Sequence, residues 1–584
     1  MLRSILIIFS LTCLLAGCTN EQKSEELRPS EQVRVLGKVW GFLKYHHPKI
    51  TQGDIDWDEA LLEILPDIIS APDREKRNAL ILRWINDLGP VPTCNPCAHE
   101  ADDSIRMADL SWLEDTQLLG DELSNALLEI YTNRVAGPKQ AYLLASQNGY
   151  AKFTENAYFE LENLSRSHRI LTILRFWNII EYWSPYRDLI KHNWDDKLED
   201  YIELALTDED PAAFQKTMEH FIAEIEDGHA QLRGGPPLPS KVPENCTIPV
   251  KMRIVEGYFT VAGYVTEPAE GIDSTVAGYV TEPVEDIDKP TAKQISGLEI
   301  GDQLLSLNGV PIAKEIADRA PLISSSNAWT RTLIIRLGLL NGECGPVALE
   351  VLRSGQALEI MSERVKLHAF SAQLQRLKQD LPGPAFQRLE NNIAYIKLSA
   401  LLRADIPKYI KEIANADGLI IDIRNYPAEY VVYALSEWFT DETTAFSAIL
   451  GPDFDTPGTY KWKRTLNIST NRNSTVPDIP IAVLVSEISL SQSEFTAMAF
   501  RKMPRTFIVG RPTAGADGDI SKIRLPGGYT VAISALGVFY PDKTPTQQIG
   551  IVPDLLVYPT HDDILAGRDE VLTAAMKQLL EQQD

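Results

Sequence analysis

The stretch "SEISLSQSEFTAMAF", residues 486–500, lies where an apolar run changes into a segment of helical spacing. The residues just before it, "IAVLV", read as a buried strand, and apolar residues recur at intervals of three and four after Ser491. We therefore predict a strand, a turn at Ser491 and a helix. A strand that feeds a helix in this way is typical of an α/β layer, so this stretch decides the fold of the C-terminal part of the chain.

Ser491 has two interpretations at this point. At the start of a helix its Oγ would lie over free backbone N–H groups that favour negative charge, and the N–H of Gln492 would be an oxyanion donor for an attacked carbonyl. Alternatively, Ser491 is an ordinary N-cap that forms a capping box with Glu494. The stretch contains no lysine or histidine, so a base for the first interpretation must come from elsewhere.

Strands and helices alternate from about residue 392 onward, which predicts an α/β layer. The expected strands are 392–401, 418–427, 480–487, 506–510 and 529–540, and the expected helices are 406–416 and 569–582.

Residues 19–232 read mainly as amphipathic helix and contain an internal repeat. "VWGFLKYHHP" (39–48) aligns without gaps with "FWNIIEYWSP" (176–185), and the same offset pairs Trp57 with Trp194. We expect two helical hairpin units of similar construction that pack together, with the aromatic residues in the core.

Residues 233–366 begin with a proline-rich break and continue as a β-rich segment. Within it, "ISGLEIGDQLLSLNGVPI" (295–312) resembles the signature of a PDZ domain. The resemblance implies a small β-barrel that accepts an extended peptide at a sheet edge, or that serves only to brace its neighbours. The candidate peptide-binding residues are Gly297, Leu298, Gly301 and Asp302. A tandem, 261–275 and 276–290, is identical at eleven of fifteen positions and is interpreted as a duplicated strand and turn that lengthens a loop.

The N-terminus carries a charged start, an apolar run from Ile5 to Leu15 and the residues "LAGC" ending at Cys18. The run is too short to span a bilayer and predicts an export signal over residues 1–18. Small residues before a cysteine resemble the lipobox of bacterial lipoproteins. The resemblance implies cleavage before Cys18, lipidation of its thiol and, with Thr19 next, outer-membrane sorting. An ordinary signal peptide is the alternative.

Export would place the remaining cysteines in an oxidising compartment. "TCNPCAHE" contains Cys94 and Cys97, for which we favour a small disulfide loop over a zinc site with His99 or a redox-active pair. The formal net charge of -25 argues against a nucleic-acid partner. The sequence predicts neither a metal nor another cofactor.

Six motifs occur in one order: "EIEDGHAQL", "GLIIDIRNYPAEY", "SLSQSEFTAMA", "VGRPTAGADG", "LPGGYTVAIS" and "YPDKTPTQQIGIVPDLLV". In this order, with the PDZ-like segment after the first, they resemble the C-terminal-processing and tricorn-like serine peptidases. The resemblance implies a ClpP- or crotonase-like catalytic layer over residues 367–584, and Ser491 as the nucleophile. It also predicts a multidomain α+β protein whose partners are polypeptide substrates.

The resemblance offers two ways to activate Ser491. One branch of the family uses a lysine after the nucleophile, but Ala516 stands at that position here. The tricorn-like branch uses a histidine before the PDZ domain, which corresponds to His229. Neutral imidazole suits general-base work near pH 7. That branch places a glutamate where this chain has Gln547, so we expect lower activity or a substitute acid such as Asp227.

The second oxyanion donor is expected in the backbone after "DIRNYP", at Ala428 or Glu429, while Asp422 and Arg424 are expected to fix that loop. Together these observations predict an exported serine endopeptidase, anchored through Cys18. The alternative is a catalytically weak or inactive peptide-binding lipoprotein on the same fold.

Overall fold

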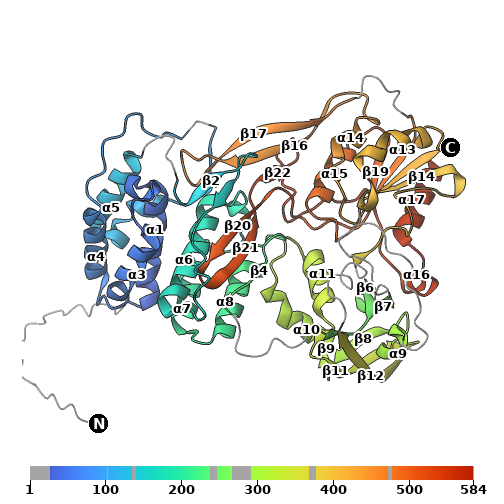
Figure 1. Ribbon diagram of the computed structural model, residues 1–584, viewed down its shortest axis with the longest axis horizontal. Coiled ribbons are helices and arrows are strands. Elements are labelled where there is room, and N and C mark those ends of the chain that lie inside the picture. The colour runs from blue at the N-terminus through green and yellow to red at the C-terminus, as the bar shows by residue number, and fades with distance from the viewer. Residues whose placement is uncertain are drawn as a thin grey trace, which may run out of the picture.

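The computed structural model describes residues 27–100, 103–134, 140–236, 246–265, 291–366, 377–470 and 477–582. Figure 1 shows helices of the N-terminal region at one end of the molecule and a sheet from the C-terminal region at the other. The long hairpin of β16 (Thr444–Pro452) and β17 (Thr459–Ile468) runs between them. The expected export signal, Cys18 and most of the tandem repeat lie outside the described residues.

Helices dominate the N-terminal region, as its periodicity predicts. They are α1 (Pro29–His46), α2 (Pro48–Thr51), α3 (Trp57–Ile69), α4 (Arg74–Asp87), α5 (Thr116–Thr132), α6 (Arg166–Trp183), α7 (Trp194–Thr207) and α8 (Pro211–Ala223).

The internal repeat has a shared structure at its aromatic residues. In the first unit, Trp40 Nε1 and Trp57 Nε1 each donate to the other residue's carbonyl oxygen at 2.9 Å. In the second unit, Trp177 and Trp194 make the same reciprocal pair at 2.7 and 3.4 Å. All four indoles are buried, so the N–H groups that burial would leave unsatisfied are hydrogen-bonded in the core.

The two units contact each other through equivalent positions. Lys38 Nζ lies 2.9 Å from Asp195 Oδ2, and the repeat-related pair, Arg175 and Asp58, also forms an ion pair. Each unit thus supplies a cation to one pair and a carboxylate to the other. This reciprocity is the mark of a local two-fold relation.

Two C-terminal segments complete this helical region. β20 (Ile520–Leu525) pairs with β21 (Tyr529–Ser534), which pairs with β4 (Leu232–Arg233), and apolar residues of β20 and β21 join the core of the N-terminal helices. β1 (Ile105–Arg106) pairs with β17, and a separate hairpin joins β2 (Leu143–Ala145) to β3 (Ala151–Phe153). The expected boundary at residue 232 therefore falls within a strand that belongs to a composite sheet.

An eight-stranded sheet forms the middle of the chain, and Cys246 and Cys344 form a disulfide there. Its strands are β5 (Cys246–Thr247), β6 (Val250–Val255), β7 (Tyr258–Tyr264), β8 (Gln303–Leu307), β9 (Val310–Pro311), β10 (Asn341–Gly342), β11 (Gly345–Arg353) and β12 (Gln356–Lys366). The helices α9 (Ala292–Ser296), α10 (Ile312–Arg319) and α11 (Ala328–Gly338) accompany it.

The C-terminal α/β layer is a six-stranded sheet in the order β13, β14, β15, β18, β19, β23, parallel except for β13. Helices α13, α14 and α15 cover one face and α17 the other, because alternate strand residues point to opposite cores. The elements are β13 (Phe386–Arg388), β14 (Ile393–Lys397), β15 (Gly418–Asp422), β18 (Ile481–Val485), β19 (Thr506–Gly510), β23 (Leu555–Leu556), α13 (Ile406–Ile413), α14 (Val432–Ser436), α15 (Gln492–Phe500), α16 (His561–Ala566) and α17 (Glu570–Glu581).

One predicted strand is wrong in its extent. Residues 529–540 form two strands, β21 and β22 (Gly537–Phe539), which belong to different sheets. β21 pairs with β4, whereas β22 pairs with β16. The apolar pattern continues across the break because both strands are buried, so periodicity alone does not mark the change of sheet.

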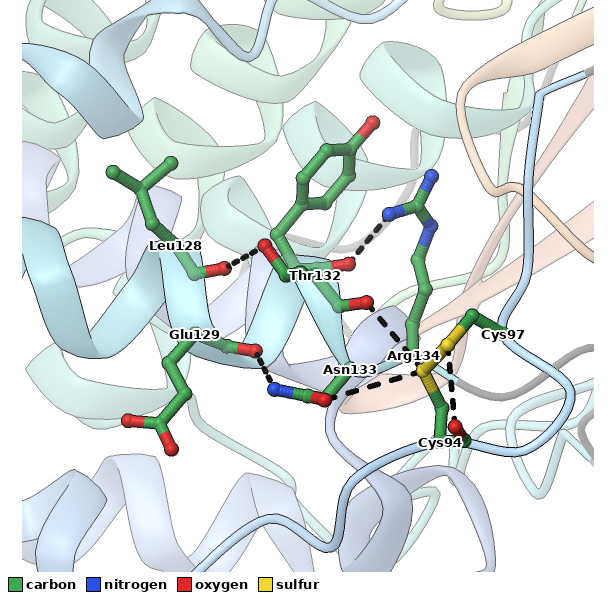
Figure 2. Close-up of a disulfide and its surroundings, with 8 residues drawn as sticks. Cys94, Cys97, Leu128, Glu129, Thr132, Asn133 and Arg134 are labelled. Carbon is green, nitrogen blue, oxygen red and sulfur yellow. Dashed lines mark hydrogen bonds between the residues drawn. A yellow bond between two sulfur atoms is a disulfide. The ribbon is translucent and has the colours of Figure 1, made fainter.

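Figure 2 shows the disulfide between Cys94 and Cys97 beside the end of α5. The Cys94 sulfur lies 3.6 Å from the Thr132 carbonyl oxygen. Across the described ranges, no helix combines the length and apolar character needed to cross a bilayer.

Candidate active site

Ser491 occupies a strained turn between β18 and α15. Its backbone has φ 55° and ψ −114°, a conformation that glycine adopts easily and that costs a residue with a Cβ of order 1–3 kcal/mol. An ordinary N-cap residue is extended instead. The turn leaves the Ser491 side chain partly exposed at the end of a buried strand.

Glu494 is buried and fixes the segment around the turn. Its carboxylate accepts hydrogen bonds from the backbone N–H groups of Ser491, Gly515 and Ala516, at 3.1, 2.7 and 3.0 Å. It also accepts one from Thr513 Oγ1. Burial raises the pKa of this carboxyl group, while the four donors lower it. The carboxylate half of the predicted capping box is therefore present, and it serves the neighbouring loop as well.

His229 and Asp227 lie just before β4, opposite the end of β21. The antiparallel register pairs Leu232 with Val531 and, continued by three residues, places His229 opposite Ser534. His229 Nδ1 lies 2.8 Å from Ser534 Oγ. Its side chain is only 9% exposed.

Ser534 links the histidine to the acid. Its backbone N–H donates to Asp227 Oδ2 at 2.6 Å and its hydroxyl donates to Asp227 Oδ1 at 2.9 Å. Because a hydroxyl has one proton, Ser534 Oγ then accepts from His229 Nδ1–H. This arrangement selects the tautomer in which Nε2 is unprotonated. Burial lowers the pKa of His229, and the nearby Asp227 charge opposes that shift.

Ala516 connects this group to Ser491. Its carbonyl oxygen accepts from Ser491 N at 3.0 Å, and a Cβ on Gly228 would come within 2.9 Å of the Ala516 Cβ. The Asp-Gly-His loop thus packs against the position where one branch of the resembled family has lysine. Within the described ranges, no hydrogen bond joins Ser491 to His229.

Gln547 approaches the acid rather than the histidine. Its Nε2 lies 3.4 Å from Asp227 Oδ1 and 3.4 Å from Ser326 Oγ, and Ser326 Oγ accepts from Gly228 N at 2.8 Å. The amide therefore supports the Asp227 side of the group.

The expected oxyanion donors differ in availability. The N–H of Gln492 has no acceptor among the described residues, and its side chain donates to the Glu429 carbonyl oxygen at 2.9 Å. The N–H of Ala428 donates to Leu398 O at 2.9 Å and is engaged. Gln492 and Glu429 therefore lie together, and Ala428 is not free to act in this conformation.

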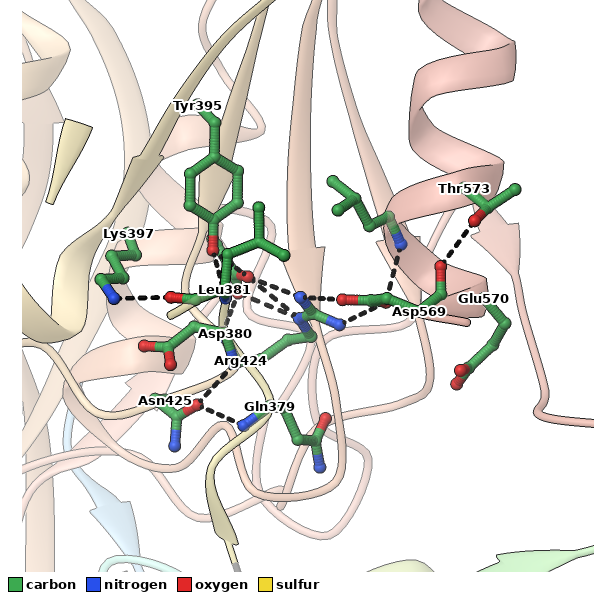
Figure 3. A network of polar contacts seen from close by, with 12 residues as sticks. Gln379, Asp380, Leu381, Tyr395, Lys397, Arg424, Asn425, Asp569, Glu570 and Thr573 are labelled. Atoms are coloured by element: carbon green, nitrogen blue, oxygen red, sulfur yellow. Dashed lines mark hydrogen bonds and ion pairs between the residues drawn. The ribbon is translucent and has the colours of Figure 1, made fainter. Parts of the chain in front are cut away.

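Asp422 and Arg424 form the loop-fixing network expected of them. Arg424 Nη2 lies 2.6 Å from Asp422 Oδ2 and 2.8 Å from Asp569 Oδ2, and Tyr395 OH donates to Asp422. Figure 3 shows Arg424 between Asp569 at the start of α17 and the residues around Tyr395. Both partners of the Asp422–Arg424 pair are buried, so removal of Arg424 would leave the Asp422 carboxylate uncompensated.

The candidate peptide-binding residues mainly support a turn. Leu298 is fully buried, and Asp302 is paired with Arg353 at 2.6 Å. The carbonyl of Gly301 lies 2.9 Å from His561 Nε2 of α16. Gly297 ends α9 in a left-handed conformation. In the part of the chain that is described, no cluster of three metal-ligating side chains occurs.

Sequence reasoning missed Ser534 and Ser326. Both are buried serines. Ser534 ends the segment "LPGGYTVAIS", but neither serine has a neighbour in the sequence that indicates a role in catalysis. Ser534 lies within the expected strand 529–540, and only the pairing of β21 with β4 gives it a role.

Comparison with known proteins identifies the family of the C-terminal α/β layer. Residues 392–557 match the profile of peptidase family S41, so this part of the chain is a peptidase family S41 domain. The chain is homologous to carboxyl-terminal-processing proteases. That of Synechocystis is 24% identical over 278 residues, 45% of this chain and 56% of the relative. Carboxyl-terminal-processing peptidase 1, chloroplastic, of Arabidopsis thaliana is 23% identical over 280 residues, 47% of this chain and 52% of the relative. The chain spans about half the length of the curated relatives it matches.

Two solved structures share the fold over most of the chain. Mature CPAF complexed with lactacystin aligns with a TM-score of 0.55 at 15% identity, covering 72% of this chain and 99% of that one. Mature CPAF aligns with a TM-score of 0.52 at 14% identity, covering 72% and 98%. At these identities the similarity shows the fold alone, a mixed arrangement of helices and sheets.

Proposed function

We propose that this protein is a serine endopeptidase that cleaves polypeptides through an acyl-enzyme, with Ser491 as nucleophile and His229 as general base. The observation that carries the proposal is the backbone of Ser491. A non-glycine residue at φ 55° and ψ −114° persists only where its surroundings impose it, and such strain concentrates at functional sites. Homology to carboxyl-terminal-processing proteases supports the same reaction.

In the proposed mechanism, His229 Nε2 takes the hydroxyl proton as Ser491 Oγ attacks the substrate carbonyl. The oxyanion receives hydrogen bonds from the backbone N–H groups of Gln492 and Glu429. His229 then gives the proton to the leaving amine, and water hydrolyses the acyl-enzyme by the same steps in reverse. Asp227 stabilises the imidazolium through the Ser534 hydroxyl, so a carboxylate is present although Gln547 replaces the family's glutamate.

The alternative is an inactive peptide-binding protein on the same fold. Gln547 in place of a carboxylate favours it, because an amide cannot stabilise imidazolium as an acid does. The Asp227–Ser534–His229 chain favours the enzyme, because it supplies that acid from another position.

A fluorophosphonate probe with a fluorogenic peptide assay separates the two. We expect the wild-type protein to be labelled and Ser491→Ala to lose labelling and hydrolysis, the latter by roughly 10⁵- to 10⁶-fold. Ser493→Ala is the matched control, since Ser493 is a buried neighbour outside the proposed mechanism and its loss should leave labelling intact. Absence of wild-type labelling under conditions where a known serine peptidase reacts contradicts the proposal.

We propose further that the protein is exported and anchored in the outer membrane through a lipid on Cys18. The apolar run and the small residues before Cys18 support this. Metabolic labelling with palmitate should mark the wild type and not Cys18→Ser. Equal labelling of both would contradict it.

For the middle sheet we propose a PDZ-like role in presenting polypeptide to the active site. The order of its motifs and its position before the S41 domain support this role. Leu298 and Asp302 are buried, so we propose that they support the fold of this sheet rather than contact the peptide.

A further inference from the structure

A cavity of about 510 Å³ lies where the three parts of the chain meet. Its walls include Ile222 of α8, Leu333 of α11 and Ile488, which follows β18. In Figure 1, α8, β4 and α11 lie in the middle of the molecule. The volume is within the range of sites that hold small molecules or side chains.

The cavity adjoins both proposed catalytic residues. Gly228 and Ala230, which flank His229, line it, and so does Leu490, which precedes Ser491. Ala514 closes the same side. A polypeptide whose carbonyl lies over Ser491 therefore has a neighbouring side chain within reach of this space.

The lining is apolar on the side of α11 and the segment before it. The aliphatic side chains there are Leu322, Ile323, Leu333, Ile334 and Leu337, joined by Leu377. Such a surface favours an apolar substrate side chain, because entry into the cavity removes the apolar surface of that side chain from water.

The charged side chains that line the cavity are carboxylates. Glu487 accepts from Arg511 Nε at 2.7 Å, and the arginines beside it lower its pKa to about 2, so it stays ionised at neutral pH. Glu219, on α8, accepts from Gln215 Nε2 at 3.0 Å. No lysine or arginine is among the described lining residues. Glu487 is itself neutralised by Arg511, whose Nη2 lies 2.6 Å from its carboxylate. An acidic substrate side chain would therefore enter with no cationic partner among the lining residues and with Glu219 as a like charge.

We propose that this cavity is the specificity pocket of the enzyme. It receives a large aliphatic or aromatic side chain next to the scissile bond and excludes aspartate and glutamate. The inference rests on the proposed peptidase function and extends it to a class of substrate: unfolded or extended polypeptide cut beside apolar residues.

The test maps the bonds that the full-length protein cuts in an unfolded, reduced protein substrate by mass spectrometry. We expect Leu, Ile, Met and Phe to be enriched beside the cut by at least about 10-fold over Asp and Glu, since pocket discrimination of this kind is worth roughly 10- to 200-fold. Cuts without apolar enrichment would overturn the proposal.

Ile334→Arg places a cation in the pocket, and Thr332→Arg is the control. Thr332 is on the same helix but outside the lining, with its hydroxyl bonded to Ala328 O. Ile334→Arg should reduce kcat/KM for a leucine-containing peptide by about 10-fold or more and raise that of its glutamate counterpart. Thr332→Arg should match the wild type. An unchanged Leu-to-Glu ratio in Ile334→Arg counts against the pocket.

Fluorophosphonate labelling keeps the two proposals separable, because the probe needs no side chain in the cavity. Wild-type protein that neither labels nor cleaves defeats the proposed function, whereas labelling and cleavage without preference defeat only the pocket. If Ile334→Arg fails to label, Leu322→Ala replaces it. This truncation at a partly exposed position of the lining should raise the ratio of Trp to Leu cleavage, and an unchanged ratio overturns the inference.

Discussion

The Ser534 hydroxyl connects the Asp227 carboxylate to the His229 imidazole by hydrogen bonds, although the side chains of Asp227 and His229 are not hydrogen-bonded to each other. The distance from His229 Nδ1 to Asp227 Oδ1 is 3.8 Å, and the Ser534 hydroxyl lies between them. A relayed carboxylate still orients the imidazole and stabilises its charged form, but less directly than an adjacent one. This single hydroxyl therefore fixes the tautomer of the proposed base, whereas burial lowers the pKa of His229 and the Asp227 charge opposes that shift.

We predict that Ser534→Ala lowers kcat by roughly 10- to 100-fold, within the contribution of positioned acid–base groups. Burial holds the pKa of His229 below its ordinary value of about 6.5, and Asp227 raises it. The acid limb of kcat/KM should therefore lie below pH 6.5 in the wild type. Ser534→Ala removes a hydrogen-bond acceptor that favours the charged imidazole, so the limb should move to still lower pH.

Ser534→Thr serves as the control, because threonine keeps a hydroxyl at this position and is favoured in strands. This variant should show the wild-type kcat and the wild-type acid limb of kcat/KM. Identical pH profiles in all three proteins would show that the relay has no role in catalysis.

At the scale of elements, the contact between α1 and α6 depends on a residue without a side chain. A Cβ on Gly41 would meet Asn178 Oδ1 at 1.6 Å. Asn178 is buried and its Nδ2 donates to Gly37 O at 3.1 Å and to Leu174 O at 2.8 Å. Any side chain at position 41 must displace this amide from its hydrogen bonds.

Gly41→Ala should destabilise the protein by about 1–3 kcal/mol through overpacking. In a calorimetric scan this corresponds to a fall in Tm of roughly 2–10 °C for the transition that includes the N-terminal helices. Gly338→Ala in α11 is the matched control, because nothing lies within 4 Å of its added Cβ. A Tm equal to that of the control would mean that the Asn178 side chain can adopt another conformation that avoids the added Cβ at no cost in stability.

Local helices and strands are predicted well from the sequence where the apolar residues follow a single helical or strand spacing. The strand and helix on either side of Ser491 form at the expected residues, as β18 and α15, because buried strands and amphipathic helices carry their own patterns. The hairpin β16–β17 was not predicted, although Asp453, Pro457 and Gly458 supply turn signals between its two strands. The register that brings Ser534 to His229 is a long-range pairing, and no sequence period encodes it.

At the scale of the whole molecule, the N-terminal and C-terminal parts share one core. Ile523, Leu525, Tyr529, Val531 and Ile533 pack among the N-terminal helices, and β4 completes the sheet that they form. The proposed active site depends on this sharing, because His229 comes from one part and Ser491 from the other. The composition of each segment predicts its class of structure but not this exchange between segments.

The stability of the whole protein should fall on acidification below neutral pH. Burial lowers the pKa of His46 to about 3 and that of His47 to about 4. Both are neutral when folded and take up protons on unfolding below about pH 6.5. Their stabilising contribution is thus complete above pH 6.5 and is lost as the pH falls toward 4, by up to about 1.4 kcal/mol per pH unit for each histidine.

The measurement is Tm between pH 7.5 and 4.5 for the wild type and His46→Gln. The variant should show a shallower decline, because one proton-linked group has been removed. Parallel curves would indicate that His46 is not linked to unfolding.

The reciprocal ion pairs of the N-terminal repeat have one further consequence. When two similar units contact each other through the same surface, each unit uses its own copy of that surface in the contact, and the interface is closed. Lys38 with Asp195 and Asp58 with Arg175 close the contact in this way. Within one polypeptide, the two repeat units therefore contact each other through two copies of one ion pair, as the subunits of a two-fold symmetric dimer do.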